Sequence, residues 1–293
     1  MKINKDIPAV SLTNIQDKSF GFKIASNREI LFHKNLDHDP FRPHRIHFYA
    51  ILFILEGEGQ HFVDFKSYPY KKGSLIFISK EQVHAFEKNW EREASFLLFT
   101  EDFLEKGNIG SNLMQQLSLY NYHRFPPVVQ LGEEQMKLFL YLTKKMHLEF
   151  DQTDDALTEE ILHASLKIFL CLAERIRKEN RKSLYNAKYQ EEYQIFQILL
   201  NQYIFETRKV KDYADKMHIS TKKLNRVTQE IIGQTAKTHI NEVLILEIKR
   251  FLMNTSLSIS EIGYKTGFEE TTNFVKYFKK YTDFRPSEFR AQF

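Results

Sequence analysis

The chain has 293 residues, which is too long for one small core and long enough for two domains. A content of 42% hydrophobic and 14% aromatic residues excludes a mainly disordered chain. The net charge of +4 lies in the last third: residues 186–293 hold 17 Lys and Arg against 13 Asp and Glu, whereas residues 1–185 hold 25 of each. This asymmetry hints at a C-terminal module that binds a polyanion.

The single cysteine, Cys171, excludes an internal disulfide framework and a cysteine-based zinc module, and it suits a reducing compartment. Because it falls in an apolar helical run with Ile168, Phe169 and Leu172, we expect a buried thiol. No segment reaches the roughly eighteen consecutive apolar residues of a membrane helix, and the first residues lack the apolar core of a signal peptide. We therefore expect a soluble, cytoplasmic protein with no membrane contact.

Residues 1–20 are mixed and polar and are interpreted as an arm. From about residue 21 to residue 100, apolar runs of strand length alternate with turn signals such as Glu56–Gly59 and Gly73. These runs are Phe48–Leu55, Gln60–Phe65, Leu75–Ile78 and Ala94–Phe99. Short strands at a spacing of roughly 8–12 residues indicate an antiparallel sandwich or a small barrel.

After Pro126 and Pro127 the pattern becomes helical, and it predicts two amphipathic helices over residues 133–148 and 156–178. The residues that share an apolar face are Met136, Phe139, Leu140 and Thr143 in the first helix, and Leu157, Ile161, Ala164, Ile168 and Leu172 in the second. Residues 177–190 are polar and charged and form the best linker candidate. Everything after about residue 190 is expected to be helical.

The C-terminal third contains an internal repeat. Val210, Tyr213, Ala214 and Met217 form one apolar stripe, and Ile259, Ile262, Gly263 and Thr266 repeat it 49 residues later. After a short turn, a second helix starts at Ser220 in one copy and near Glu270 in the other, and both end alike, at Gly233 and Asp283. Gly, and less readily Asp, tolerates the left-handed conformation that ends a helix. Each copy therefore has the layout of a helix-turn-helix, whose second helix enters the major groove of DNA.

One long amphipathic helix is predicted between the copies. Its apolar residues are Ile240, Val243, Leu244, Ile248, Phe251 and Leu252. Such a helix would hold both recognition helices on one side of a duplex, about one helical turn (~34 Å) apart. Apolar stripes alone are typical of any helical core, and helix-turn-helix geometry also occurs in proteins that do not bind DNA. The residues on the polar faces of the helices must therefore distinguish DNA binding from a purely structural role.

The polar faces of the two second helices favour DNA binding. The candidate contacts are Ser220, Thr221, Lys222, Lys223, Asn225 and Arg226 in the first copy, and Glu270, Thr271, Thr272, Asn273, Lys276, Lys279 and Lys280 in the second. Arg and Lys can read guanine, Asn can pair with adenine, and Thr fits a phosphate or the thymine methyl group. Basic and amide residues thus coincide with the helices expected to enter the groove.

Residues from about 190 to 293 resemble the DNA-binding domain of AraC/XylS-type bacterial transcription regulators, most specifically over Ser258–Arg290. The resemblance implies base-reading roles for Lys222, Asn225 and Arg226, and for Thr271, Thr272, Asn273 and Lys276. Four positions depart from the family pattern: Gly263 stands for Ala, Asp283 for Gly, and Leu244 and Ile248 for an Arg and an Ala of the linking helix. The missing Arg puts one polar contact in doubt and leaves the expected fold unchanged.

The stretch Pro43–Phe86 is similar to the sensor domain that precedes this module in many family members. The resemblance implies a cupin-like antiparallel β-barrel followed by helices that pair two subunits. The expected architecture is multidomain: residues 1–130 form the cupin-like sensor domain, residues 131–185 a helical dimerisation segment and linker, and residues 186–293 an all-α domain with two helix-turn-helix units joined by a long helix.

Cupins often bind a metal through His-x-His, a Glu and a later His, because alternate residues of a strand share a face. Here His44 and His47 are three apart and would point to opposite faces, and only His84 stands where a late ligand would be. We therefore expect no metal and no cofactor. His44, His47, Tyr49 and His84 remain candidate contacts to a small molecule in the barrel.

The leading hypothesis is a sequence-specific transcription regulator, for instance an activator, controlled by a small molecule in the barrel. It would not be an enzyme, and its partners would be promoter DNA, a second copy of the chain and RNA polymerase. The alternative is a cupin-type metalloenzyme with a helical appendage. A third reading is a scaffold whose helices bind only protein partners.

Overall fold

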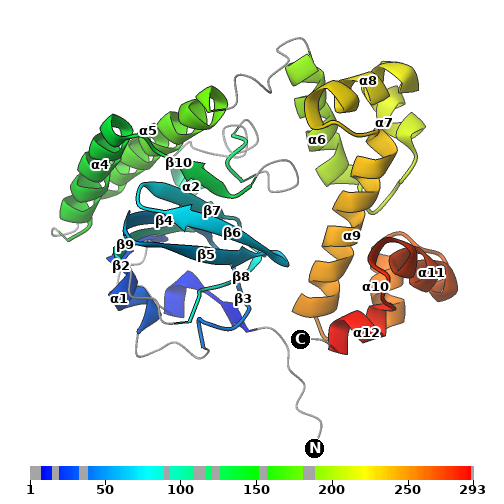
Figure 1. Ribbon diagram of the computed structural model, residues 1–293, viewed down its shortest axis with the longest axis horizontal. Helices are drawn as coiled ribbons and strands as arrows, with labels where there is room; N and C mark the ends of the chain where they lie inside the picture. The colour runs from blue at the N-terminus through cyan, green and yellow to red at the C-terminus, as the bar shows by residue number, and fades with distance from the viewer. Residues whose placement is uncertain are drawn as a thin grey trace, which may run out of the picture. The chain divides into compact units, whose positions relative to one another are not determined.

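The computed structural model of the chain describes residues 8–14, 20–32, 39–88, 93–107, 117–120, 126–151, 157–180 and 189–291. Its internal contacts divide the chain into two compact units, of which one is Pro8–Asn180 and the other contains Arg181–Phe293. The first unit is rich in strands, and the described part of the second is helical (Figure 1).

The first unit contains two five-stranded sheets. One sheet has, in spatial order, β1 (Ala9–Val10), β3 (His44–Ile46), β8 (Val83–Ala85), β5 (Glu58–Val63) and β6 (Lys66–Lys71). The other has β10 (Val128–Gln130), β7 (Ser74–Ile78), β4 (Tyr49–Glu56), β9 (Glu93–Phe99) and β2 (Phe22–Ser26). The expected antiparallel pairing holds except at β1, which runs parallel to β3 with Val10 beside Ile46. The part of residues 1–20 that the structure describes therefore includes an edge strand as well as the 3-10 turn η1 (Leu12–Asn14), and not simply an arm.

The central strand β4 is buried on both faces of its sheet. Ala50, Leu52 and Ile54 point into the core between the two sheets. Ile51 and Phe53, which alternate with them, point into a second core on the other side. A strand covered on both faces has a continuous apolar sequence instead of an alternating one, which is why residues 49–55 contain no polar residue except the hydroxyl of Tyr49.

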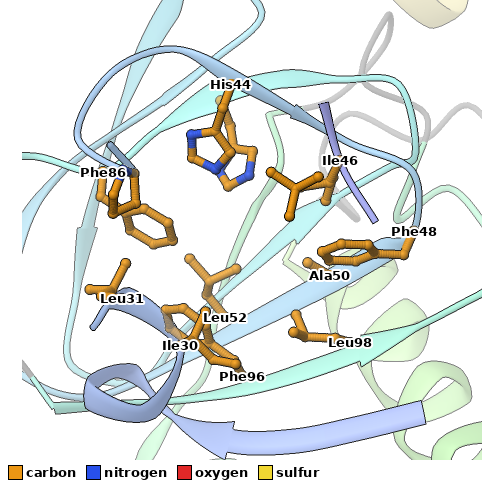
Figure 2. Close-up of a pocket in the computed structure, with 13 residues that line it drawn as sticks. Ile30, Leu31, His44, Ile46, Phe48, Ala50, Leu52, Phe86, Phe96 and Leu98 are labelled. Atoms are coloured by element: carbon orange, nitrogen blue, oxygen red, sulfur yellow. The ribbon is translucent and has the colours of Figure 1, made fainter. Parts of the chain in front are cut away.

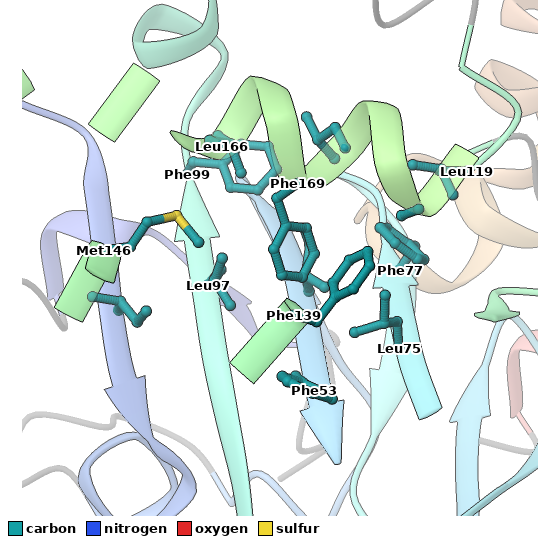
Figure 3. Packing of buried hydrophobic residues seen from close by; sticks show 14 of the residues in the cluster. Phe53, Leu75, Phe77, Leu97, Phe99, Leu119, Phe139, Met146, Leu166 and Phe169 are labelled. Atoms are coloured by element: carbon teal, nitrogen blue, oxygen red, sulfur yellow. The ribbon is translucent and has the colours of Figure 1, made fainter. Parts of the chain in front are cut away.

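The outer face of this sheet is covered by α4 (Glu133–Asp151) and α5 (Thr158–Glu179) (Figure 1). Figure 3 shows Phe139 of α4 and Phe169 of α5 between the helices and the strands, and their rings meet edge to face at 4.6 Å. The unit also contains the short helices α1 (Asn27–Leu31) and α2 (Glu101–Lys106).

The buried face of α5 differs from the predicted one. The residues that pack on the sheet include Leu162, Leu166, Phe169, Leu170 and Ala173. The stripe predicted as core instead faces outward, with Leu157, Ile161 and Ile168 exposed at 63%, 44% and 51%. The expectation of a buried Cys171 thiol is also wrong, because Cys171 is exposed on the same side of the helix. The helix carries two apolar stripes, and periodicity does not tell which one meets the sheet.

The last turns of α5 are not part of a linker, as the range 177–190 suggested, although residues 181–188 of that range lie outside the described residues. Arg177 is buried and donates to the carbonyl oxygens of Ser118 and Pro126 at 2.7 and 3.0 Å. Glu174 accepts hydrogen bonds from the backbone and hydroxyl of Ser118. This polar pair fixes the segment 117–120 against the helix.

The helices of the second unit are α6 (Gln190–Tyr203), α7 (Val210–Lys216), α8 (Thr221–Ile232), α9 (Ala236–Asn254), α10 (Ile259–Lys265), α11 (Thr271–Thr282) and α12 (Pro286–Ala291). The predicted long helix between the repeats is α9, in which Ile240, Leu244 and Ile248 are fully buried. Helices α7 and α8 form the first repeat, and α10 and α11 form the second. The turn between the paired helices is one residue longer in the second repeat, as the spacing predicts.

Candidate nucleic-acid interface and sensor cavity

The first helix-turn-helix is built by α7 and α8. The hydroxyl of Ser220 accepts a hydrogen bond from the Lys223 backbone N–H, which caps the start of α8. Gly233 ends the helix at φ 71°, in the left-handed region predicted for it. Ala214, Leu224 and Val227 are fully buried where the two helices cross. The opposite face of α8 is thereby turned outward.

The second helix-turn-helix has the same backbone with different contacts. Asp283 ends α11 at φ 64°, so the predicted left-handed Asp is confirmed. A Cβ on Gly263 would lie 3.3 Å from the Phe274 side chain, which explains why a small residue is needed at the crossing. Glu270 holds the capping position but makes no capping hydrogen bond with its side chain; its carboxylate accepts from the Asn273 amide at 3.3 Å.

The candidate residues of α8 do not all face outward. Ser220, Thr221, Lys222, Lys223 and Arg226 are exposed. Asn225 is half-buried, and its amide donates to the carbonyl of Thr221 at 3.1 Å and accepts from the backbone N–H of Ala236 at 3.0 Å. Lys223 Nζ lies 3.1 Å from a carboxylate oxygen of Glu192 on α6. The structure thus brings Lys222 and Arg226 together as the least engaged cations of this helix.

The polar face of α11 is more open. Thr272, Asn273, Lys276, Lys279 and Lys280 are exposed, and they line one side of the helix opposite the buried Phe274 and Phe278. Thr271 is half-buried and donates to the Ser260 hydroxyl at 3.1 Å.

The two helix-turn-helix units are joined by more than α9. The Arg208 guanidinium stacks 4.0 Å from the centre of the Phe268 ring and donates to the carbonyl of Gly267 at 3.3 Å. Asn241 of α9 accepts from the Tyr277 hydroxyl at 2.9 Å and donates to that of Tyr281 at 2.7 Å. These bonds fix the second helix-turn-helix to the segment before the first helix-turn-helix and to the linking helix α9.

Sequence reasoning did not single out Arg208 or Lys237, which lie near Lys280. The Lys237 ammonium donates to the carbonyl of Arg208 at 2.8 Å. Its pKa is lowered by partial burial and by the neighbouring charges of Arg208 and Lys280. In the described part of the chain, none of the three cations Arg208, Lys237 and Lys280 pairs with a carboxylate. Their positive charges therefore add up at one place between the two helix-turn-helix units.

The strand-rich unit, Pro8–Asn180, contains a cavity between its two sheets (Figure 2). The empty space between the lining side chains, including the part that is open to solvent, is about 430 Å³. The lining residues come from five strands, α1 and three connecting segments: Val10, Ile30, Leu31, Pro40, His44, Ile46, Phe48, Ala50, Leu52, His84, Phe86, Phe96 and Leu98. Of the four candidate ligand contacts, His44 and His84 line this cavity.

The other two candidates lie elsewhere. His47 is exposed, with Nδ1 2.6 Å from a carboxylate oxygen of Glu81. Tyr49 points to the helical side of its sheet, where it stacks on Phe99 and meets Tyr120 edge-on. Burial, and to a lesser degree the charge of Glu101, raises the pKa of Tyr49 to about 12. Both are close to His44 in the sequence, but neither lines the cavity: His47 lies in the bend between β3 and β4, and the strand geometry of β4 turns Tyr49 to the opposite face of its sheet.

His61 was missed by the sequence analysis. It is fully buried on β5, its Nε2 lies 3.3 Å from His84 Nδ1, and the rings of His84 and His44 are 4.2 Å apart. Burial, together with the charge of His44, lowers the pKa of His61 to about 3. The sequence did contain one signal for its burial, because His61 and the apolar Val63 are two residues apart and therefore share a face of the strand. Across the described residues, no three or more His, Cys, Asp or Glu side chains are placed to hold a metal ion together.

Comparison with known proteins agrees with this two-part organisation. A model of the AraC-like ligand binding domain matches residues 28–166, and a model of a helix-turn-helix domain matches residues 213–292. The transcriptional activator RhaS of Citrobacter koseri is 20% identical over 276 residues, which cover 93% of this chain and 95% of that one. The Msm operon regulatory protein of Streptococcus mutans is 25% identical over 246 residues, covering 83% and 84%.

Among solved structures, ToxT of Vibrio cholerae O395 aligns with 93% of this chain and 98% of its own, at a TM-score of 0.43 and 13% identity. The sequence relatives are named as transcription regulators, and nothing in the comparisons supports a cupin-type metalloenzyme. No helix in the described residues is both long and apolar enough to cross a membrane.

Proposed function

The chain belongs to the AraC family of ligand-regulated, DNA-binding transcription regulators, and from this premise we propose which residues carry each part of the function. Residues 1–130 form the sensor, residues 131–185 the pairing segment and linker, and residues 186–293 the DNA-binding domain. A regulator of this kind works where the chromosome lies, so we place it in the bacterial cytoplasm. It catalyses no reaction, in keeping with the regulators it resembles.

Base reading is assigned to Lys222 and Arg226 of α8 and to Thr272, Asn273 and Lys276 of α11. The observation that carries this assignment is the coincidence of exposed basic and amide side chains on the outward faces of both second helices. Contacts to phosphate are assigned to the residues at the helix starts and beside the reading positions: Ser220, Thr221, Lys223, Glu270 through its backbone N–H, Lys279 and Lys280. Asn225 and Thr271 are reassigned to structural roles, because their side chains already bond within the unit.

The test is a shift assay with the native upstream region at several salt concentrations. Binding should weaken steeply with salt. Arg226→Ala and Lys276→Ala should each cost about 1–3 kcal/mol, or roughly 5- to 150-fold in affinity. Lys265→Ala, an exposed cation of α10 off both reading faces, is the matched control and should bind like the wild type. Equal affinity for unrelated DNA, or full affinity of both reading variants, would contradict the assignment.

We assign pairing of two copies to the exposed apolar stripes of α4 and α5. These stripes include Leu138, Tyr141 and Leu148 on α4, and Ile161 and Ile168 on α5 with Leu157 directly before it. Exposed large apolar side chains on two neighbouring helices are typical of an interface. Sedimentation equilibrium should find a dimer for the wild type and a monomer for the double variant Ile161→Glu/Ile168→Glu, whereas the adjacent exposed Lys167→Glu stays dimeric. A dimer that survives the double variant contradicts this assignment.

Activation is proposed from the names of the relatives, and it implies RNA polymerase as a partner. Run-off transcription with purified polymerase and the native promoter should yield more transcript when the protein is added. A fall in transcript would instead indicate repression.

A further inference from the structure

We propose that the effector held by the sensor cavity is a small, uncharged, mostly apolar molecule with one hydrogen-bonding group, and not a sugar or another polyol. This inference rests on the proposed function, because it takes the cavity between the sheets as the effector site.

The lining is apolar except at one end. Figure 2 shows His44 and a second imidazole together at one end of the cavity, and hydrocarbon side chains around the rest. Among the residues that the structure describes, no side chain with a hydroxyl, an amide or a fixed charge lines it. A polyol would therefore lose its water contacts and find protein partners for few of its hydroxyls. A charged effector would meet no lining side chain of opposite fixed charge.

The aromatic rings of the lining favour a flat or branched hydrocarbon body. Phe86 and Phe96 are almost parallel at 5.6 Å, and Phe48 closes the opposite side of the view in Figure 2. Ala50 and Leu52 of β4 form part of the floor, and both belong to the core between the sheets. A ligand of this shape would extend the core and gain free energy from the apolar surface it buries.

The histidine end provides the single polar contact. His44 Nδ1 bonds the carbonyl of Arg42 at 3.0 Å, and His84 Nδ1 bonds His61 Nε2 at 3.3 Å. These bonds hold both lining imidazoles in fixed orientations. His61 lies buried behind them, and burial lowers its pKa, so it adds no positive charge to this end. Because the rest of the lining is hydrocarbon, an uncharged hydroxyl or carbonyl group fits this end better than a carboxylate or an ammonium group.

The test uses the full chain with three probes of graded polarity: 4-ethylphenol, ethylbenzene and glucose. The first two should raise the Tm of the sensor unit in a concentration-dependent way, because a ligand that binds only the folded state stabilises it, while glucose leaves it unchanged. Titration calorimetry should give a Kd about tenfold weaker for 4-ethylphenol with His84→Leu, in line with the loss of one hydrogen bond. That variant should leave the binding of ethylbenzene within about twofold.

A second variant shows where the probes bind. Ala50→Phe fills the floor of the cavity and should abolish both shifts, whereas His47→Gln, at an exposed position between β3 and β4, should keep them. Circular dichroism and promoter affinity verify that each variant folds. If Ala50→Phe does not fold, Leu98→Phe, which fills the cavity from β9, replaces it.

The outcomes separate this inference from the proposed function. A Tm rise with glucose that Ala50→Phe removes overturns the apolar class and leaves the effector site standing. Probe binding that persists in every folded cavity-filled variant overturns the cavity itself, and so does the absence of any shift with both apolar probes. If the wild-type protein does not bind its promoter specifically, the proposed function is refuted, whatever the results with the three probes.

Discussion

The two helix-turn-helix units are more similar in backbone conformation than in the residues at equivalent positions. Each has two residues in the left-handed region, one in the turn and one at the end of the second helix. In the first unit these are His218 at φ 54° and Gly233 at φ 71°. In the second they are Gly267 at φ 80° and Asp283 at φ 64°. Glycine therefore occupies opposite positions in the two copies.

The surroundings explain where glycine is indispensable. A Cβ on Gly267 would overlap the carbonyl oxygen of Phe205, whereas a Cβ on Gly233 would meet nothing within 4 Å. The turn of the second unit presses against the backbone after α6, and the end of α8 lies open. A left-handed residue can thus be Asp or His where space is free, but it must be Gly where two backbones touch.

The polar residues differ in the same way. In the first unit Asn225 ties α8 to the start of α9, and Lys223 pairs with α6. In the second unit, within the part of the chain that the structure describes, Asn273 bonds only Glu270, three residues away. Equivalent-looking faces are therefore unequal: part of the first face stabilises the domain, and most of the second remains available to DNA.

The largest expected effect comes from comparing the two glycines. Gly267→Ala should destabilise the DNA-binding unit by about 3 kcal/mol or more, because strain at positive φ is added to backbone overlap. Gly233→Ala carries only the conformational cost, about 1 kcal/mol. Urea denaturation followed by circular dichroism measures both. Equal losses would show that the contact with Phe205 does not set the requirement.

Next in size is the comparison of the two asparagines. Asn225→Ala leaves the buried Ala236 N–H without its acceptor and should cost about 1–3 kcal/mol of unfolding free energy. Asn273→Ala should change stability by less than about 0.5 kcal/mol and reduce promoter affinity instead. The two variants are compared in the same urea titration and the same shift assay. A stable Asn225→Ala protein with weakened DNA binding would restore Asn225 as a base reader.

A smaller effect is expected at the contact between the units. Arg208→Gln removes the stacking on Phe268 and should cost about 1 kcal/mol of stability. Because this contact helps to fix the second unit to the first, the variant should also tolerate a promoter whose two half-sites are moved apart by one base pair better than the wild type does. Shift assays on the native and the lengthened promoter test this. An unchanged preference for native spacing would leave α9 as the sole source of the fixed geometry.

The smallest expected effect is a gain. Asp283→Gly should stabilise the DNA-binding unit by about 0.5–1 kcal/mol, because glycine adopts the left-handed conformation without a steric penalty. Thermal unfolding should show a Tm rise of a few degrees. His218→Gly is the counterpart in the first unit and should act in the same direction. A lower Tm in both variants would show that these side chains make stabilising contacts.

Local features of this fold were predictable from the sequence. The cap at Ser220 and the left-handed ends at Gly233 and Asp283 are determined by residues within one or two helical turns of each other. The repeat was predictable because both copies place similar residues at the same offsets. The apolar run of β4 likewise predicted a strand, because it has the length of a strand and is followed by the glycine turn at residues 56–59.

Features that depend on distant partners were not predictable. The burial of one stripe of α5 depends on the sheet it meets, and the exposed Cys171 follows from the same choice. The parallel pairing of Val10 with Ile46 joins two segments that are far apart in the sequence, and no local sequence pattern indicates that they pair. Asn225 could be assigned as a base reader or as a structural residue until its bond to Ala236 was seen. His61 reaches His84 only because β5 and β8 are neighbours.

The exposed Cys171 gives the chain a built-in reporter. It is the only cysteine in the sequence, and its thiol lies on the outward side of α5, on the same side as the exposed Ile168. A maleimide spin label or dye therefore attaches at one known point per chain without any mutation. In a pair of labelled copies, one inter-label distance would describe how the two sensor units approach each other, and its change on adding promoter DNA or a probe could be followed in solution.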